Sequence, residues 1–123
     1  MSSIELKETS HSPRVICKLD GEITLYGRSI PENAIDFYMP ILKWLENYKN
    51  APASVTNYTF ELDYINSISF KMIYEVLKVG KQLKEAGHTV YVEWKYEDDD
   101  EEILDQGKTF EQKSGLNFKF TAV

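Results

Sequence analysis

A hydroxyl group lies where a predicted strand gives way to a predicted helix, within Phe60–Met72. The strand is expected to end at Asn66 and the helix to begin at Ser67. The first N–H groups of a helix have no internal partners, and the helix dipole adds positive potential there. A phosphate on the Ser67 hydroxyl is therefore physically favourable at this position. The backbone N–H groups expected to receive it are those of Ile68, Ser69 and Phe70.

Two further interpretations of this junction remain open. Either Ser67 or Asn66 can act as an ordinary helix N-cap, whose side-chain oxygen accepts a hydrogen bond from the first turn. Ser69 also competes with Ser67 as the phosphoacceptor, although a serine in the first turn can instead bond locally. We favour Ser67 because it directly follows the polar Asn66 at the end of the strand.

A second polar segment, Gly27–Asn33, joins a predicted strand to a predicted helix. It is a candidate for a loop that contacts a partner or a phosphate, and Arg28 could supply a charge-assisted hydrogen bond. The alternative is a plain helix start, since Ser29 and Pro31 are residue types that helix N-termini favour and Glu32 falls in the first turn.

The remaining reactive residue types form no catalytic or metal-binding pattern, so we predict a non-enzymatic protein with no cofactor. Cys17 is the single cysteine, and the two histidines, His11 and His88, lie far apart in the sequence. The acidic run Glu97–Glu102 lacks the spaced ligands and the glycine of a calcium loop. It predicts a solvated loop or the cap of a third helix.

Composition limits the classes of partner. The chain has 123 residues and a net charge of -6, which predicts one domain over residues 1–123 and disfavours nucleic acid. No apolar stretch approaches the ~18 residues that span a bilayer, so no membrane insertion is expected. No signal peptide is recognisable at Met1, and we expect a cytoplasmic protein.

Hydrophobic periodicity predicts the element order β-β-β-α-β-α-β-α-β. An Asp20-Gly21 turn separates the second and third strands, and Gly87 closes the second helix. The first helix is expected to bury one face, formed by Ile35, Tyr38, Met39, Leu42, Leu45 and Tyr48. This order favours an α/β fold with a mixed sheet and helices packed mainly on one side.

The aromatic residues admit two interpretations. Trp44, Trp94 and the eight tyrosines could form an exposed binding patch. Their helical or alternating spacing instead favours packing in the core.

Two motifs together resemble the SiaC family of bacterial regulatory phosphoproteins, over roughly residues 4 to 122. The first is Gly27-x-Ser-x-Pro-Glu-Asn-Ala-x-x-Phe-Tyr-x-Pro-x-x-x-Trp-Leu-x-x-Tyr48. The second is Phe60-x-Leu-x-Tyr-Ile-Asn-Ser-x-Ser-x-Lys71. The family is similar to the STAS fold of anti-sigma-factor antagonists, in which a phosphorylatable serine follows a strand at the start of a helix. Ile68 departs from the family pattern, because members often carry a run of hydroxyl residues there.

The resemblance implies a phosphorylation switch centred on Ser67, with Ser69 as the alternative site. A dedicated protein kinase would phosphorylate it, and a PP2C-like phosphatase would reverse the modification. The unphosphorylated form would bind and activate a diguanylate cyclase, raising cyclic di-GMP and promoting aggregation or biofilm. The residues expected to contact partners are Arg28, Ser29, Pro31, Glu32, Asn33, Asn66, Ser67, Ser69 and Lys71.

Two rival functions remain at this stage. A constitutive protein–protein adaptor would bind its partner regardless of phosphate. A small enzyme would require a pocket with a base or a metal, and the sequence offers no such cluster.

Overall fold

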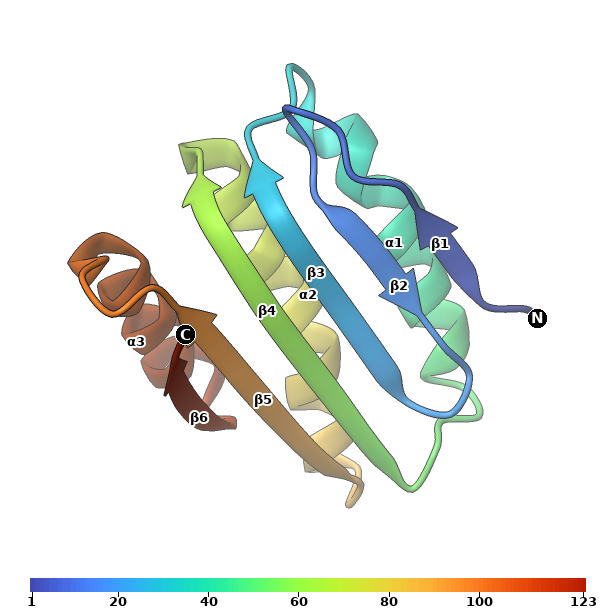
Figure 1. Ribbon diagram of the computed structural model, residues 1–123. Helices are drawn as coiled ribbons and strands as arrows, with labels where there is room; N and C mark the ends of the chain where they lie inside the picture. The colour runs from blue at the N-terminus through green and yellow to red at the C-terminus, as the bar shows by residue number, and fades with distance from the viewer.

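Six strands and three helices form two layers in the computed structural model, which describes residues Met1–Val123. The sheet forms one layer and all three helices cover one of its faces (Figure 1). The predicted element order and the predicted α/β fold with helices on one side are therefore confirmed. The elements are β1 (Ile4–Leu6), β2 (Arg14–Cys17), β3 (Glu22–Ser29), α1 (Ala34–Tyr48), β4 (Val55–Ile65), α2 (Ser67–Glu85), β5 (Thr89–Tyr96), α3 (Glu101–Ser114) and β6 (Asn117–Ala122).

The strands lie in the sheet in chain order, from β1 to β6. The β1–β2 and β2–β3 pairs are antiparallel, whereas β3, β4, β5 and β6 are parallel to one another. Each helical crossover adds the next strand at the same edge of the sheet. Because such crossovers share one hand, the three helices fall on the same face. None of these helices combines the length and the apolar character that crossing a membrane requires.

The core lies between the sheet and the helices and contains 25 buried hydrophobic residues. Strand β4 shows the alternation: Tyr58, Phe60 and Leu62 are buried beneath the helices, and the residues between them are partly exposed on the other face. Parallel strands are usually covered on both faces. Here the uncovered face carries polar side chains, so water can solvate it.

Turn chemistry explains the β2–β3 connection predicted at Asp20-Gly21. Gly21 has a φ of 100°, a backbone conformation that side chains rarely adopt. A Cβ atom at this position would also overlap the Val55 carbonyl oxygen. Only glycine fits this turn without rearrangement.

The start of α1 and its buried face differ from the prediction. Strand β3 continues to Ser29, and Asn33 is the N-cap, so the helix begins after the predicted Ser29–Pro31 start. Ile35 and Met39 are 52% and 40% exposed, contrary to their predicted burial. The helix is apolar on more than one face, so its hydrophobic spacing is compatible with burial of either of two faces. The buried residues are Ala34, Tyr38, Ile41, Trp44, Leu45 and Tyr48.

The structure also decides the role of the acidic run and the location of the tryptophans. The Asp100 carboxylate accepts a hydrogen bond from the Ile103 N–H at 3.0 Å, so the acidic run does cap the third helix. Trp44 and Trp94 are buried, which confirms that they pack in the core. The Trp94 indole N–H also donates to the Ile103 carbonyl oxygen at 2.9 Å, which fixes α3 against β5.

Candidate functional site

The two sequence motifs meet at the carboxyl ends of two neighbouring strands, β3 and β4. Because β3 and β4 are parallel neighbours, the segments that follow them emerge side by side, at the top of Figure 1. The Asn66 N–H donates to the Ser29 carbonyl oxygen at 3.0 Å, which joins the two segments directly. The site therefore consists of the starts of α1 and α2 and the chain leading into each.

Asn66, rather than Ser67, is the N-cap of α2. Its backbone is extended, and its side-chain oxygen accepts a hydrogen bond from the Ser69 N–H at 2.9 Å. Its carbonyl oxygen accepts from the Phe70 N–H at 2.9 Å. Ser67 is therefore the first helical residue, and its hydroxyl is not needed to close the helix end.

The free backbone donors are not the three expected. The Ser69 and Phe70 N–H groups are already bonded to Asn66, so they cannot receive a phosphate without breaking the cap. Of the predicted three, Ile68 retains an N–H with no hydrogen bond in the structure, and the Ser67 N–H is also unbonded. Two adjacent donors at the positive end of a helix thus remain beside the Ser67 hydroxyl.

The two candidate acceptor serines differ sharply in accessibility. Ser67 is exposed, whereas Ser69 is fully buried. The Ser69 Oγ makes no hydrogen bond, so it is a buried polar atom left unsatisfied. A modifying enzyme can reach Ser67 in the folded protein but can reach Ser69 only after the first turn of α2 opens.

The remaining residues predicted to contact partners fall into two groups. The larger group is accessible, with Pro31 and Asn66 half-buried and the rest exposed: Arg28, Glu32, Asn33 and Lys71. Asn33 also caps α1, accepting a hydrogen bond from the Asp36 N–H at 3.1 Å.

Ser29 forms the second group, because it is fully buried. Its hydroxyl lies 2.6 Å from the Tyr38 hydroxyl, which ties the end of β3 to α1. Burial raises the pKa of Tyr38, and the hydrogen bond to Ser29 opposes that rise. The predicted direct contact of Ser29 and Ser69 with a partner does not fit these positions, since neither side chain reaches the surface.

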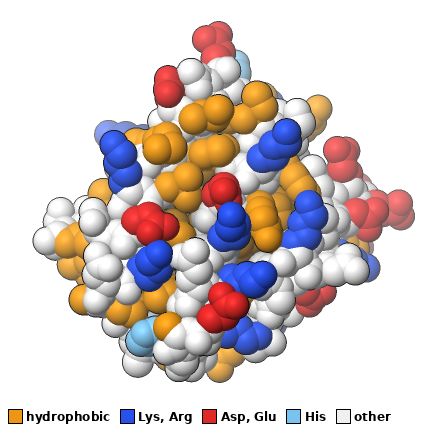
Figure 2. Space-filling model, turned by 180° about the vertical axis from the view of Figure 1, so that it is seen from behind, with side chains coloured by type: hydrophobic (Ala, Val, Ile, Leu, Met, Phe, Trp, Pro, Cys, Tyr) orange, Lys and Arg blue, Asp and Glu red, His pale blue; other side chains and the backbone are white.

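An exposed apolar surface adjoins Ser67. Ile35 and Met39 project from the first turns of α1, and Ile68 follows Ser67 on α2 and is 50% exposed. Helices α1 and α2 run side by side in the same direction (Figure 1). Hydrophobic side chains gather near the top of Figure 2, at the end of the molecule where both helices begin. We call these three residues the apical patch. Apolar side chains grouped at a surface mark protein contact sites more often than single ones do.

Sequence reasoning missed the apical patch, because it assigned Ile35 and Met39 to the core. The usable signal was an excess of apolar residues in α1, where one buried stripe cannot hold all of them. Ile68 interrupts the hydroxyl run of the family pattern. A large apolar side chain in the first turn, directly beside an accessible hydroxyl, was itself a sign of a contact surface.

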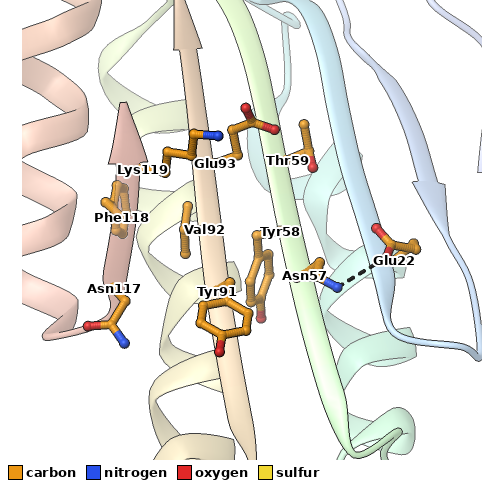
Figure 3. A pocket seen from close by; sticks show the side chains of 10 residues that line it. All are labelled: Glu22, Asn57, Tyr58, Thr59, Tyr91, Val92, Glu93, Asn117, Phe118 and Lys119. Atoms are coloured by element: carbon orange, nitrogen blue, oxygen red, sulfur yellow. Dashed lines mark hydrogen bonds between the residues drawn. The ribbon is translucent and has the colours of Figure 1, made fainter. Parts of the chain in front are cut away.

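A hollow of about 420 Å³ also lies on the uncovered face of the sheet. Figure 3 shows that polar and hydrophobic side chains line it, and the Asn57 amide donates to the Glu22 carboxylate at 3.1 Å. Asn57 and Ile65 are separated by eight residues of β4, or about 26 Å at ~3.3 Å per residue. This hollow is therefore separate from the surface around Ser67.

Fold and sequence together place the chain in a family of small regulatory α/β proteins. The chain belongs to the SiaC family of regulatory phosphoproteins, whose sequence model matches residues 6–123. The family resemblance drawn from the two motifs is thereby confirmed.

Particular relatives come from Pseudomonas aeruginosa. An uncharacterized protein of strain UCBPP-PA14 is 21% identical over 123 residues, covering 99% of this chain and 98% of its own length. The crystal structure of apo-SiaC has a TM-score of 0.90 at 21% identity and covers 99% of this chain and 100% of its own. SiaC in complex with the diguanylate cyclase SiaD, as its activator, has a TM-score of 0.87 at 21% identity, covering 98% and 99% of the two chains.

Proposed function

We propose that this chain is a phosphorylation-controlled activator that binds a diguanylate cyclase when Ser67 is free and releases it when Ser67 carries phosphate. The chain itself catalyses no reaction, and a protein kinase and a PP2C-like phosphatase set its state. Family membership supports the regulatory role. The SiaC–SiaD complex, in which SiaC is the activator, motivates the choice of a cyclase as partner.

One observation carries the proposal: Ser67 is exposed, first in its helix, and beside the apical patch, while Ser69 is sealed in the core. Of the two serines in the first turn of α2, only Ser67 thus presents an accessible hydroxyl at a surface suited to protein contact.

Phosphate at this position acts through local electrostatics. It adds about -1.5 to -2 charge, which the free N–H groups of Ser67 and Ile68 can stabilise in the unbound protein. Lys71 lies four residues on and is exposed, so its ammonium can reach the same phosphate along the helix face. A partner that covers the apical patch would instead have to desolvate this charge. Phosphorylation therefore favours the free protein without requiring a change of fold.

The modification site is tested by mass spectrometry of the protein isolated from its own cells, with and without phosphatase treatment. We expect one phosphate, mapped to Ser67 by fragmentation. A phosphate mapped to Ser69 would contradict the structural preference for Ser67. Absence of phosphate under all growth conditions would favour the constitutive adaptor.

The switch is tested by titrating the protein into a diguanylate cyclase encoded in the same genome. We expect phosphoserine incorporated at position 67 to weaken binding about 100-fold, which corresponds to about 2.7 kcal/mol. Ser67→Ala should bind and activate like the unmodified protein, and Ser67→Asp should weaken binding only partly because it has less charge.

The matched control places phosphoserine at Ser54, an exposed serine just before β4. It therefore lies at the amino end of that strand, whereas Ser67 lies beyond the carboxyl end. This control adds the same charge far from the apical patch and should leave binding unchanged. Equal affinity of the Ser67 phosphoprotein and the unmodified protein would refute the switch and leave an adaptor.

A further inference from the structure

A groove of about 400 Å³ lies between α2 and α3, further along the helical face than the apical patch. Its walls combine apolar surface with cationic side chains. Figure 2 shows Lys and Arg side chains gathered on the middle of this face. The lining residues are Phe70, Lys71, Met72, Tyr74, Glu75, Lys78 and Lys113. We call it the Tyr74 groove.

The floor of the groove is aromatic and packs against the core. Phe70 of α2 stacks on the buried Phe110 of α3, with ring centroids 4.4 Å apart. Tyr74 follows one turn later on α2 and is half-buried. Packed rings of this kind offer apolar contact area with little loss of side-chain freedom on binding.

Two ammonium groups converge on the same ring. The Lys78 Nζ lies 5.9 Å from the Tyr74 ring centroid, and the Lys113 Nζ lies 5.7 Å from it. Both distances fall within the range of cation–π contacts. Lys78 also pairs with Glu75 at 3.1 Å, whereas Lys113 has no carboxylate partner in the structure.

The groove is positive on an acidic protein. Its three lysines and one glutamate give a local formal charge of +2, while the whole chain carries -6. Lys71, like Lys113, forms no ion pair in the structure. Clustered cations without counter-charges attract an anionic ligand and disfavour a cationic one.

The spacing of the lysines selects the kind of anion. Lys71 and Lys78 are seven residues apart on one helix, a rise of about 10.5 Å. Lys78 and Lys113 converge on the Tyr74 ring, so a ligand that also engages Lys71 has to extend along α2. An extended peptide covers about 10 Å with three residues, so two carboxylates flanking apolar side chains match both the lysines and the aromatic floor.

We propose that the Tyr74 groove binds an acidic segment of a protein partner, with apolar side chains against Tyr74 and Phe70 and carboxylates at the lysines. This surface goes beyond the switch at Ser67, and occupancy of the groove does not require phosphate on that serine. Lys71 is shared with a phosphate on Ser67, whereas Lys78, Lys113 and Tyr74 are not, so phosphorylation weakens this docking contact without removing it.

The test uses the full-length protein, ¹⁵N-labelled, with the peptide Glu-Glu-Leu-Phe-Glu-Glu as the probe. We expect amide shifts concentrated at residues 70–78 and around residue 113, weakening as salt rises from about 50 to 300 mM. The peptide Lys-Lys-Leu-Phe-Lys-Lys should cause no shifts there. Shifts centred elsewhere, or none with the acidic peptide, would overturn the proposal.

Charge reversal identifies the groove as the cause. The double variant Lys78→Glu/Lys113→Glu should weaken the acidic peptide at least tenfold. Lys43→Glu/Lys119→Glu makes the same change of net charge at exposed positions on α1 and β6 and should leave affinity within twofold. Equal loss in both variants would show non-specific attraction and would defeat the proposal.

Two further measurements separate peptide docking from small-anion binding and from the switch at Ser67. Inorganic phosphate should not displace the peptide at equal concentration, and displacement would indicate a small-anion site instead. Ser67→Ala should bind the peptide as the wild type does, so a failed phosphorylation switch leaves this test intact. Loss of peptide binding in Ser67→Ala would tie the groove to the switch surface and contradict their independence.

Discussion

Capping and phosphoacceptance fall to different residues in this chain. Asn66 closes the helix end through its side-chain oxygen, so Ser67 is left with an exposed hydroxyl that no structural hydrogen bond requires. A hydroxyl engaged in capping would have to leave its N–H partner before accepting phosphate. The division of roles allows position 67 to be modified without dismantling the start of α2.

This division predicts unequal costs for two neighbouring substitutions. Asn66→Ala removes the cap and should lower the free energy of unfolding by about 1 kcal/mol. Ser67→Ala removes no hydrogen bond and should change it by less than about 0.5 kcal/mol. Urea denaturation of both variants measures the difference. A larger loss from Ser67→Ala than from Asn66→Ala would mean that Ser67 is the true cap.

Residue-level reasoning from the sequence located the junction but not its accessibility. The strand-to-helix break at Asn66 follows from local patterns, and the structure confirms it. The burial of Ser69 depends on how α2 packs on the rest of the fold, which residue spacing does not specify. The same is true of Ser29, whose hydroxyl faces Tyr38 in the core.

At the scale of elements, α3 is positioned by a close approach to β5. A Cβ atom added to Gly107 would lie 2.5 Å from the Cδ1 and Nε1 atoms of Trp94. Trp94 is fully buried, and its indole N–H is bonded to the Ile103 carbonyl oxygen. The ring therefore has no direction in which to move, and only glycine allows this helix spacing.

Gly107→Ala should accordingly destabilise the protein by about 1–3 kcal/mol through overpacking. Helix propensity alone predicts the opposite sign, a gain of about 0.5–1 kcal/mol. Chemical denaturation decides between them, with Gln112→Ala, at an exposed position of α3, as the control. A stabilised Gly107→Ala variant would mean that α3 can shift away from Trp94 at no cost.

The order of helices and strands was predictable because glycine, proline and polar residues separate segments whose hydrophobic residues have clear helical or alternating spacing. The orientation of α1 was not, because Ile35 and Met39 satisfy helical spacing as well as the residues that the sheet buries. Packing against β3 and α2 determines which of the two apolar faces of α1 is buried. The apical patch is the consequence, and it became visible only in three dimensions.

At the scale of the whole molecule, charge is distributed unevenly over the helical face. Helix α2 contains four lysines and two glutamates, although the chain is acidic overall. The acidic run stands at the start of α3. The net charge of the sequence disfavours nucleic acid as a partner. It does not show that positive and negative side chains lie on different parts of the surface, because that separation arises only when α2 packs beside α3. The fold class was therefore predictable, and the positive groove was not.

The core also determines how the molecule responds to alkaline pH. Burial raises the pKa of the Cys17 thiol from 9.0 to about 12, and it raises the pKa of Tyr38 and Tyr58 as well. Each group stays protonated in the folded protein while the unfolded chain releases its proton. The stability that Cys17 contributes is thus complete below about pH 9 and is lost as pH rises from there toward about 12.

Cys17→Ala isolates this contribution, because alanine has no proton to release. Between pH 8 and pH 10 the wild type should lose about 1.4 kcal/mol more unfolding free energy than the variant does. Urea denaturation at both pH values provides the four free energies, and Tyr91→Phe, at an exposed position, controls for removal of a titratable group from the surface. Comparing losses rather than absolute stabilities cancels the cavity that Cys17→Ala creates, since that cost is the same at both pH values. Parallel losses in the wild type and Cys17→Ala would show that the thiol ionises as readily in the folded state as in the unfolded chain, which contradicts its complete burial beneath the helices.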